Sequence, residues 1–401
     1  MGAYHPCLPE FCRECERFGA WYRLSGSEEE ARAKAAIICL EQAGEFAAGL
    51  SHDGFLRGAV LGQIDRIEPV PGAHPEAWRA LVTYPNEVTG YDLSQVLSTL
   101  YGTVSLQRGI RLDRLKDCPR LWERFRGPRF GRDGLRERLD APQRPLLCAT
   151  VHGRGLDAGG LAQMAYRLAA GGIDIVKEDH NVPTADFEGF AERVARCSDA
   201  VMLGAERSGR RSLYAANVTG PVGDLPRRAQ FAKEQGAGAL LVCPGLVGFD
   251  AMRALAADDA LALPILAHPA MLGSLATSAD SGIAHYVLFG QLMRLAGADA
   301  TIFPQVGPRF GFTLDECCDV ALGAAVPMGT LKAILPAPGG KLGLEQIPDL
   351  MDVYGNDMLL LLGGDLVTPG ADLEDTCSRF VSLIEEAARA WSDTDRNTAN
   401  P

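Results

Sequence analysis

The sequence lacks the features that mark membrane, secreted and nucleic-acid-binding proteins. It has no run of the roughly 18 apolar residues that a membrane-spanning helix requires. Its 39 Lys and Arg are outnumbered by 51 Asp and Glu, a net charge of −12, so no basic stripe is available to bind nucleic-acid phosphates or anionic lipid. Glu10, Arg13, Glu14 and Glu16 interrupt the N-terminal residues, which therefore do not resemble a signal peptide. We expect a cytoplasmic protein that binds neither nucleic acid nor membrane.

Two common motifs are missing as well. The 11 cysteines include the pair Cys12 and Cys15, but no second close pair or Cys–His cluster completes four zinc ligands, so we expect reduced thiols. No Gly-x-Gly-x-x-Gly turn follows the strand predicted at 145–151, and this argues against a doubly wound dinucleotide-binding sheet.

The 401 residues are too many for one ordinary core, and the first third of the chain mixes helices and strands without alternation. Strands are predicted at 20–24, 58–64 and 79–84. Helices are predicted from Ala31 to about Gln42, after a capping box of Ser27 and Glu30, and at 93–100. Residues 1–138 are therefore predicted to form an α+β domain, of which 122–138, rich in Arg, Gly and Pro, would be the connector.

From residue 139 to about 385 the pattern changes to strict alternation of short apolar runs with helical stretches. Eight runs are predicted to be strands: 145–151, 173–177, 212–218, 239–243, 263–266, 300–303, 332–335 and 358–362. Helices are predicted at 161–170, 187–196, 227–235 and 285–296. Eight strand–helix units over about 240 residues predict an α/β fold of the (β/α)8 TIM-barrel type, with 386–401 as a polar tail.

Polar residues follow most of these runs, where a barrel carries its active site. The clearest case is 173–177, a β-branched run that ends in Lys177, Asp179 and His180; solvated charges at a strand end are the simpler alternative. The candidates that stand after the other strands are His152, Arg154, Asn217, His268, Gln305, Arg309, Gly340, Gly363 and Gly364. The Gly-Gly turns at 339–340 and 363–364 favour a phosphate site, because glycine lets backbone amides approach an anion closely. The sequence thus predicts a site for a phosphorylated sugar, with Arg309 either contacting the substrate or pairing on the rim.

Several motifs resemble the large chain of RuBisCO. Residues 171–179 follow the pattern Gly-Gly-x-Asp-x-x-Lys-x-Asp, and further similar segments lie at 97–102, 126–131, 214–220 and 268–271. The order and spacing agree from about residue 20 to 375, while many departures indicate a RuBisCO-like protein, the non-carboxylating form IV type. The resemblance implies a ferredoxin-like N-terminal domain and a homodimer in which Glu41 completes the neighbouring subunit's active site.

The resemblance also implies roles in the barrel. Lys177 stands where the family has a carbamylated lysine, Asp179 where it has a metal carboxylate, and His180 where a glutamate normally binds magnesium. His152 and Arg154 occupy the positions of two lysines, the first of which relays protons. The remaining matches are to a histidine near the substrate, His268, and to a phosphate site at Gly340, Gly363 and Gly364.

His180 leaves the cofactor open. Mg²⁺ is implied by the resemblance, but an imidazole ligand suits Mn²⁺, Fe²⁺ or Zn²⁺ better. In the alternative arrangement, His180 lies outside the metal shell and Lys177 stays an uncarbamylated ammonium. Of these two arrangements, we favour a retained divalent metal.

Departures from the family argue against carbon dioxide fixation. Pro269, Phe303 and Pro338 replace polar groups that hold a second phosphate, and an apolar wall there would not hold a dianion. No lysine lies between Phe303 and Thr313. Thr103 stands where the methionine-salvage enolases of the family keep a lysine base.

We therefore expect a lyase or isomerase that acts on a singly phosphorylated keto sugar through an enediolate. Our first expectation is decarboxylation of a 3-oxo sugar acid phosphate, as in apiose catabolism, because decarboxylation requires no base to start it. The alternatives are an enolase or isomerase of a methylthio-sugar phosphate, in sulfur salvage, and an inactive barrel that serves as a binding or regulatory protein.

Overall fold

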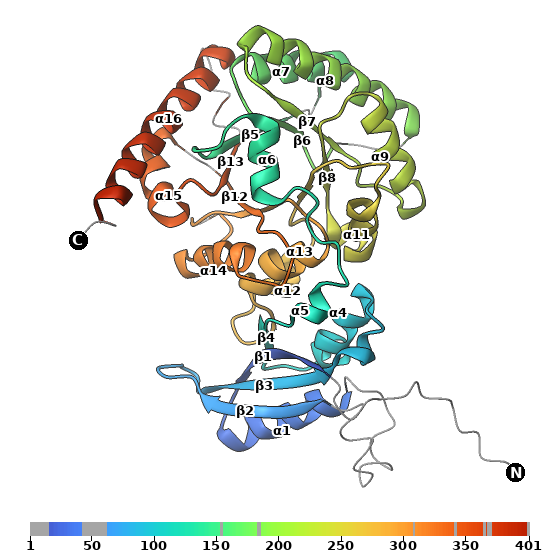
Figure 1. Ribbon diagram of the computed structural model, residues 1–401, viewed down its shortest axis with the longest axis vertical. Helices are drawn as coiled ribbons and strands as arrows, with labels where there is room; N and C mark the ends of the chain where they lie inside the picture. The colour runs from blue at the N-terminus through green and yellow to red at the C-terminus, as the bar shows by residue number, and fades with distance from the viewer. Residues whose placement is uncertain are drawn as a thin grey trace, which may run out of the picture. The chain divides into compact units, whose positions relative to one another are not determined.

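The computed structural model describes residues 16–41, 62–152, 155–182, 186–307, 309–340, 343–363, 366 and 371–398 (Figure 1). The chain forms two compact units. The first comprises Met1–Phe125, Ser274–Ala284 and Met328–Thr330, and the second comprises Arg126–Gly273, His285–Pro327 and Leu331–Pro401. Among the described residues, no helix is long and apolar enough to cross a membrane, and the eight cysteines are all free.

The first unit is a five-stranded sheet with helices. Its strand order is β10-β4-β1-β3-β2, with bounds β1 Arg17–Ser25, β2 Gln63–Pro69, β3 Ala77–Pro85, β4 Ile110–Leu115 and β10 Gly282–Ile283. The helices are α1 Glu28–Glu41, α4 Leu93–Tyr101 and α5 Pro119–Trp122, with 3-10 turns at Asn86–Thr89 and Thr103–Leu106. The capping box predicted from Ser27 and Glu30 is present, since the backbone N–H of Ser27 donates to Glu30 Oε2 over 2.8 Å. This sheet confirms the predicted α+β class of the N-terminal part.

The second unit is a closed parallel barrel, as predicted. The strands follow one another around the barrel in the order β11-β12-β13-β5-β6-β7-β8-β9. Their bounds are β5 Leu146–Val151, β6 Ile175–Glu178, β7 Leu213–Asn217, β8 Ala239–Val242, β9 Ile265–Ala267, β11 Ala300–Pro304, β12 Leu335–Gly340 and β13 Leu359–Leu362.

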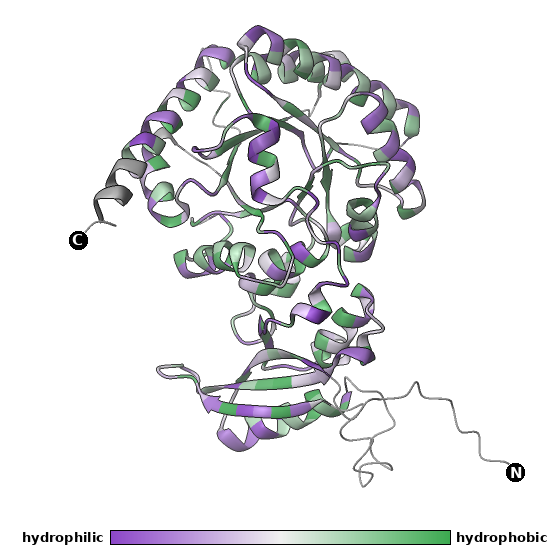
Figure 2. Cartoon of the chain, viewed as in Figure 1, coloured by the Kyte–Doolittle hydropathy of each residue, from purple (hydrophilic) through white to green (hydrophobic). Residues whose placement is uncertain are grey.

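Helices follow the strands and surround the barrel. Their bounds are α7 Ala158–Ala170, α8 Phe187–Ser208, α9 Leu225–Glu234, α10 Pro244–Val247, α11 Phe249–Ala257, α13 Leu292–Leu295, α14 Leu314–Ala325, α15 Ile347–Tyr354 and α16 Leu373–Thr398. Helix α6, Gly131–Leu139, precedes β5 and packs Leu135 and Leu139 against the barrel interior. The short helix α12, Gly273–Ala276, belongs mostly to the first unit. A π-helix at Tyr286–Gln291 precedes α13, and short 3-10 turns lie at Val222–Asp224 and Leu344–Gln346. Hydrophobic and hydrophilic residues alternate along these helices, as expected of helices packed on a barrel (Figure 2).

Several predicted elements differ from the structure. The residues predicted as a polar tail, 386–401, continue helix α16 as far as Thr398. Most of the strand predicted at 58–64 lies outside the described residues, and β2 covers Gln63–Pro69. The connector predicted at 122–138 contains helix α6, which accounts for most of its second half. The seventh strand is Leu335–Gly340 rather than 332–335. The prediction missed it because Pro336 and Pro338 lie inside it, and proline is uncommon in strands. The helix predicted at 285–296 is π-helical over Tyr286–Gln291 before it becomes α-helical.

Alternate residues of each strand face the barrel interior. The interior is filled by small and branched side chains: Leu146, Cys148, Ile175, Ala215, Ala239, Leu241, Leu266, Ala300, Ile302, Leu335, Ala337, Leu359 and Leu361. Because side chains alternate along a strand, the next inward positions toward the C-terminal ends are Thr150, Lys177, Asn217, Cys243, His268, Pro304, Gly339 and Gly363. The barrel is thus closed by an apolar core, with a polar layer above it.

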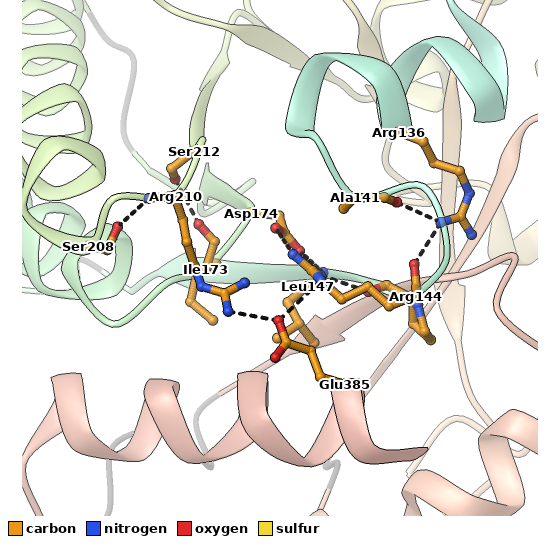
Figure 3. A network of polar contacts seen from close by, with 11 residues as sticks. Arg136, Ala141, Arg144, Leu147, Ile173, Asp174, Ser208, Arg210, Ser212 and Glu385 are labelled. Carbon is orange, nitrogen blue, oxygen red and sulfur yellow. Dashed lines mark hydrogen bonds and ion pairs between the residues drawn. The ribbon is translucent and has the colours of Figure 1, made fainter. Parts of the chain in front are cut away.

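The N-terminal end of the barrel is fixed by buried aspartates. Asp174 accepts two hydrogen bonds from the Arg144 guanidinium, at 2.7 and 2.6 Å, and one from the Leu147 backbone N–H at 2.7 Å (Figure 3). Glu385 of α16 lies beside this pair and binds Arg210 (Figure 3). Asp299 acts similarly before β11, where the backbone N–H groups of 130, 131 and 265 donate to it. These contacts stabilise the face opposite the predicted active site.

Candidate active site

The charged side chains at the end of β6 point to opposite sides of the strand. Glu178 points outward and is buried, where the Arg193 Nε donates to its Oε1 over 2.7 Å and the Tyr214 hydroxyl donates to the same oxygen over 2.5 Å. The Asn217 backbone N–H donates to Glu178 Oε2 over 2.8 Å. Glu178 is therefore fully engaged in fixing the strand, and only Lys177 and Asp179 face the mouth.

Asp179 is the centre of the polar cluster at the mouth. Its Oδ2 lies 3.1 Å from Nδ1 of His152, which follows β5, and its Oδ1 lies 3.2 Å from Nδ1 of His180. The Asn181 backbone N–H also donates to Oδ1, over 2.9 Å. The hydrogen bonds from His152 and then His180 hold the pKa of Asp179 well below its usual range, so the carboxylate is ionised at neutral pH.

The hydrogen-bond partners fix which nitrogen of each imidazole carries the proton. The Asn181 amide Nδ2 lies 2.9 Å from His180 Nε2, so Nε2 accepts and Nδ1–H donates to Asp179. His152 has Asp179 as its only hydrogen-bond partner among the described residues, so with Nδ1–H donated, its Nε2 lone pair is available. The His152 side chain is 43% exposed, which leaves this nitrogen accessible to a substrate.

His268, after β9, is the third imidazole of the cluster. Its ring stacks on that of His180, with centroids 4.0 Å apart and planes at 21°. The Ala270 backbone N–H donates to His268 Nδ1 over 3.2 Å, so the proton lies on Nε2. Burial, followed by the charge of Lys177, lowers the pKa of His268 to about 2, so this imidazole is neutral at physiological pH and its Nε2–H can donate.

Lys177 is buried inside the barrel below this cluster. Its Nζ donates to the Glu178 carbonyl over 3.1 Å, and Cys148, Asp179 and Cys243 are close enough to interact with its charge. Burial lowers the pKa of Lys177, which raises the fraction of neutral amine. A neutral amine is the form that adds carbon dioxide, so Lys177 has the chemistry that carbamylation requires.

Asn217, a predicted substrate ligand, is used by the protein itself. It is 1% exposed, and its Nδ2 donates to the carbonyls of Asp179 and His180 over 3.2 and 3.4 Å. Its Oδ1 accepts from the Thr219 backbone N–H over 3.1 Å. Asn217 thus fixes the turn that presents Asp179 and His180.

The glycines predicted to bind phosphate lie on neighbouring strands next to the histidine cluster. Gly340 pairs with Leu362 and Leu362 with Ala149, so β12, β13, β5 and β6 are consecutive in the barrel. Gly340 has φ +152°, and a Cβ on Gly363 would lie 3.2 Å from the Gly340 carbonyl oxygen, so both positions favour glycine. Two strand spacings, about 10 Å, separate Gly363 from the Asp179 strand, a distance that a five-carbon sugar phosphate spans.

The predicted apolar wall of Pro269, Phe303 and Pro338 is not formed as expected. Phe303 follows the inward-facing Ile302, is 1% exposed and packs edge-on against Tyr354 of α15, with ring centroids 6.2 Å apart. Pro338 pairs with Phe303 and alternates with the inward-facing Ala337, so it faces outward too. Pro269 follows His268 directly after β9. The three residues predicted to exclude a second substrate phosphate therefore do not form an apolar wall together.

Other predicted residues are not brought into the cluster. Arg154 and Gly364 lie outside the described residues. Arg309 is exposed, with its guanidinium 4.9 Å from the Phe310 ring centroid. Glu41 is the exposed last residue of α1, in the first unit. Sequence reasoning missed Asn181 and the Ala270 amide, whose roles depend on hydrogen bonds that appear only once the chain is folded.

Known proteins match this chain over most of its length. The family model "Ribulose bisphosphate carboxylase large chain, catalytic domain" matches residues 132–307. The 5-methylthioribulose-1-phosphate isomerase of Rhodospirillum rubrum is 31% identical over 93% of this chain and 97% of its own. This chain belongs to the family of RuBisCO-like proteins.

Two further proteins support the assignment of this RuBisCO-like protein. The crystal structure of a Rubisco-like protein from Rhodopseudomonas palustris superposes with a TM-score of 0.81, at 31% identity, over 92% of this chain and 98% of its own. A 2,3-diketo-5-methylthiopentyl-1-phosphate enolase of Geobacillus kaustophilus is 30% identical over 87% of this chain and 81% of its own. This RuBisCO-like protein is thus an enzyme of the non-carboxylating branch, as predicted.

The donor set of this RuBisCO-like protein does not fit the magnesium site that the family implies. Magnesium prefers an octahedral shell of oxygen ligands, yet Asp179 is the only carboxylate among the described residues that is directed into the cluster. Both Asp179 oxygens accept hydrogen bonds from imidazoles, and both nitrogens of His180 are used. Across the described ranges, no group of three His, Cys, Asp or Glu side chains is placed to hold a metal.

Proposed function

We propose that this RuBisCO-like protein isomerises a methylthio-sugar phosphate by proton transfer between neighbouring carbons. A 2-ketose 1-phosphate loses a proton from a carbon next to the carbonyl, and the resulting enediolate takes up a proton at another carbon. One base, one donor to the carbonyl oxygen and one phosphate site are needed, and the cluster at the mouth has a candidate for each. The pairing of His152 with Asp179 is the observation that carries the proposal.

His152 is the proposed base. Because Nδ1–H is donated to an ionised carboxylate, Nε2 is held as the acceptor and the imidazolium that forms is stabilised by Asp179. A positioned histidine base contributes about 10²- to 10⁴-fold to a proton-transfer step. After the proton has been taken up, the same nitrogen can return it to the second carbon, so that one group serves both half-reactions.

His268 is the proposed donor to the substrate's carbonyl oxygen. Its Nε2–H is set by the Ala270 amide, and a neutral imidazole donor becomes more stabilising as charge develops on the oxygen. The backbone around Gly340 and Gly363, beside His152, is the proposed seat of the phosphate. Arg154, Arg309 and Gly364 remain proposed substrate contacts from the sequence.

Isomerisation is better supported than the other two reactions. The Rhodospirillum rubrum isomerase is matched over nearly its whole length, and the lysine base of the family's enolases is replaced here by Thr103. Decarboxylation of a 3-oxo sugar acid phosphate, expected from the sequence, rests on the absence of a base, and the His152–Asp179 pair provides one. No proposed step uses a metal ion, and carbamylation of Lys177 remains a proposal from the family resemblance.

We also propose a homodimer with a shared active site. Glu41 ends α1 with its side chain exposed, and the family resemblance assigns it to the neighbouring subunit's site.

The test is a comparison of three substrates with one enzyme preparation. 5-Methylthioribulose 1-phosphate, 2,3-diketo-5-methylthiopentyl 1-phosphate and a 3-oxo sugar acid phosphate are incubated separately and followed by ³¹P NMR and carbon dioxide detection. We expect a new ketose phosphate from the first substrate, without loss of carbon. Carbon dioxide release from the third alone would support decarboxylation, and no turnover of any would support a binding protein.

A further inference from the structure

We infer that His180 is a positioning residue that has replaced a metal ligand, so that the mouth holds two imidazoles on one carboxylate, and a third stacked on one of them, in place of a divalent cation. The inference deepens the proposed function and rests on it for the identity of the reaction.

The hydrogen bonds of His180 use its whole polar capacity. Its Nδ1 lies 3.2 Å from Asp179 Oδ1, and its Nε2 lies 2.9 Å from the Asn181 amide. A metal ligand must offer a free lone pair, and the only lone pair of the neutral ring, on Nε2, is occupied by Asn181. His180 therefore acts through Asp179, whose carboxylate it holds in place for His152.

The second contact of His180 is made by its ring face. Stacking on His268 at 4.0 Å restricts rotation of both rings, while the Ala270 amide fixes the proton of His268 on Nε2. A carboxylate at position 180 could not stack and would add a second negative charge beside Asp179. Two adjacent carboxylates repel each other unless a cation lies between them, so a glutamate there creates a demand for metal that a histidine does not.

The two oxygens of Asp179 are divided between two imidazoles. Oδ2 serves His152 and Oδ1 serves His180. Oδ1 also accepts from the Asn181 backbone N–H, so both of its lone pairs are used. Oδ2 keeps one lone pair beside the hydrogen bond to His152, so Asp179 offers a cation at most one ligand position.

The experiment restores the carboxylate and measures cation binding directly. Wild-type protein, His180→Glu and Asp179→Asn are titrated with MnCl₂ in bicarbonate buffer, and free Mn²⁺ is counted by electron paramagnetic resonance. In parallel, ¹⁵N-histidine NMR reports the protonated nitrogen of each ring, with single His→Gln variants for assignment. The exposed His74→Gln serves as the matched control, which leaves the other signals unchanged.

We expect no Mn²⁺ bound at this site in the wild type, and affinity raised about tenfold or more in His180→Glu. The NMR spectra should show Nδ1–H for His180 and Nε2–H for His268. Mn²⁺ binding to the wild type that Asp179→Asn removes, opposite tautomers, or failure of His180→Glu to gain affinity would each overturn the inference. The wild type could show the expected tautomers and bind no Mn²⁺, yet fail to turn over the methylthio-sugar phosphate. That result would reject the proposed substrate and support the inference about His180.

Discussion

The Nδ1 atom of His152 lies 3.1 Å from Oδ2 of Asp179. The two residues follow neighbouring parallel strands, β5 and β6, whose pairing of Val151 with Glu178 brings the following residues together. An imidazole bound in this way has one nitrogen committed to a carboxylate and the other directed to solvent, which is the arrangement of a general base.

Replacement of Asp179 by asparagine should remove the orientation of His152. The amide presents an N–H to one of the two imidazoles, so the tautomer of His152 is no longer fixed and its imidazolium is no longer stabilised. We expect kcat to fall about 10²- to 10⁴-fold with a smaller change in KM. Steady-state kinetics on the ketose phosphate measure this.

Asp186→Asn is the matched control for that change. Asp186 caps α8 by accepting from the Gly189 N–H over 2.6 Å, and asparagine caps helices as well as aspartate does. We expect wild-type kinetics from this variant. Equal loss of activity in both variants would mean that charge removal in general, rather than the His152 contact, is responsible.

The pKa of His268 predicts how stability depends on pH. Burial lowers this pKa to about 2, below the ordinary value of about 6.5 that the unfolded chain retains. Between these values the unfolded state binds more protons than the folded state, so acidification destabilises the protein. The contribution of His268 to stability is present above about pH 6.5 and is lost as the pH falls toward 2.

Urea unfolding of wild type and His268→Asn at about pH 7.5 and about pH 5.5 measures this linkage. We expect the wild type to lose more stability than the variant on acidification. Parallel losses in the two proteins would show that His268 does not resist protonation in the folded state.

Asp174 predicts a loss of stability at the opposite end of the barrel. It is 1% exposed, binds Arg144 in bidentate fashion and accepts from the Leu147 amide (Figure 3). Asp174→Asn removes the charge bound to the largely buried Arg144 guanidinium and leaves it, among the described carboxylates, only Glu385 Oε1, 3.9 Å away, so we expect the free energy of unfolding to fall by about 3–5 kcal/mol. Chemical denaturation measures it, with Asp259→Asn as control.

Asp259 is the suitable control because its side chain is 77% exposed although it contacts Arg126 and Arg129. Solvent screens this pair, so we expect its loss to leave the unfolding midpoint almost unchanged. A comparable fall in both variants would mean that burial does not distinguish the two ion pairs.

The proposed dimer predicts complementation between two inactive variants. If Glu41 completes the partner's site, a mixed dimer of Glu41→Gln and His152→Gln has one site with both changes and one with neither. Random mixing makes half of the dimers mixed, so about one quarter of wild-type activity should return after co-expression. Recovery of none would contradict a shared site, and each variant expressed alone gives the baseline.

The sequence predicts much of this barrel because each strand is a short apolar run that ends in polar residues. The predicted bounds of β12 are wrong because Pro336 and Pro338 disguise the strand, and α6 is not predicted because Arg, Gly and Pro dominate its surroundings. Which strand residues face inward depends on pairing and cannot be settled from the chain alone. For this reason the sequence places Phe303 at the mouth, whereas it packs outward against Tyr354.

Part of the site is also predictable. The sequence identifies His152, Asp179, His180 and His268 as neighbours at strand ends, and the structure brings these four side chains together. The assignment of a metal site is a different kind of inference, because it carries over a role from a family in which position 180 is a carboxylate. The stack on His268 has no sequence signal, since it depends on the distance between β6 and β9 across the mouth.

The most direct test of the central claim is deuterium exchange catalysed by His152. 5-Methylthioribulose 1-phosphate is incubated in D₂O with the wild type and with His152→Gln, and the product is analysed by ¹H NMR and mass spectrometry. The account predicts a ketose phosphate that carries solvent deuterium on a carbon next to the carbonyl, formed about 10²-fold or more slowly by the variant. Equal exchange rates in the two proteins would contradict it.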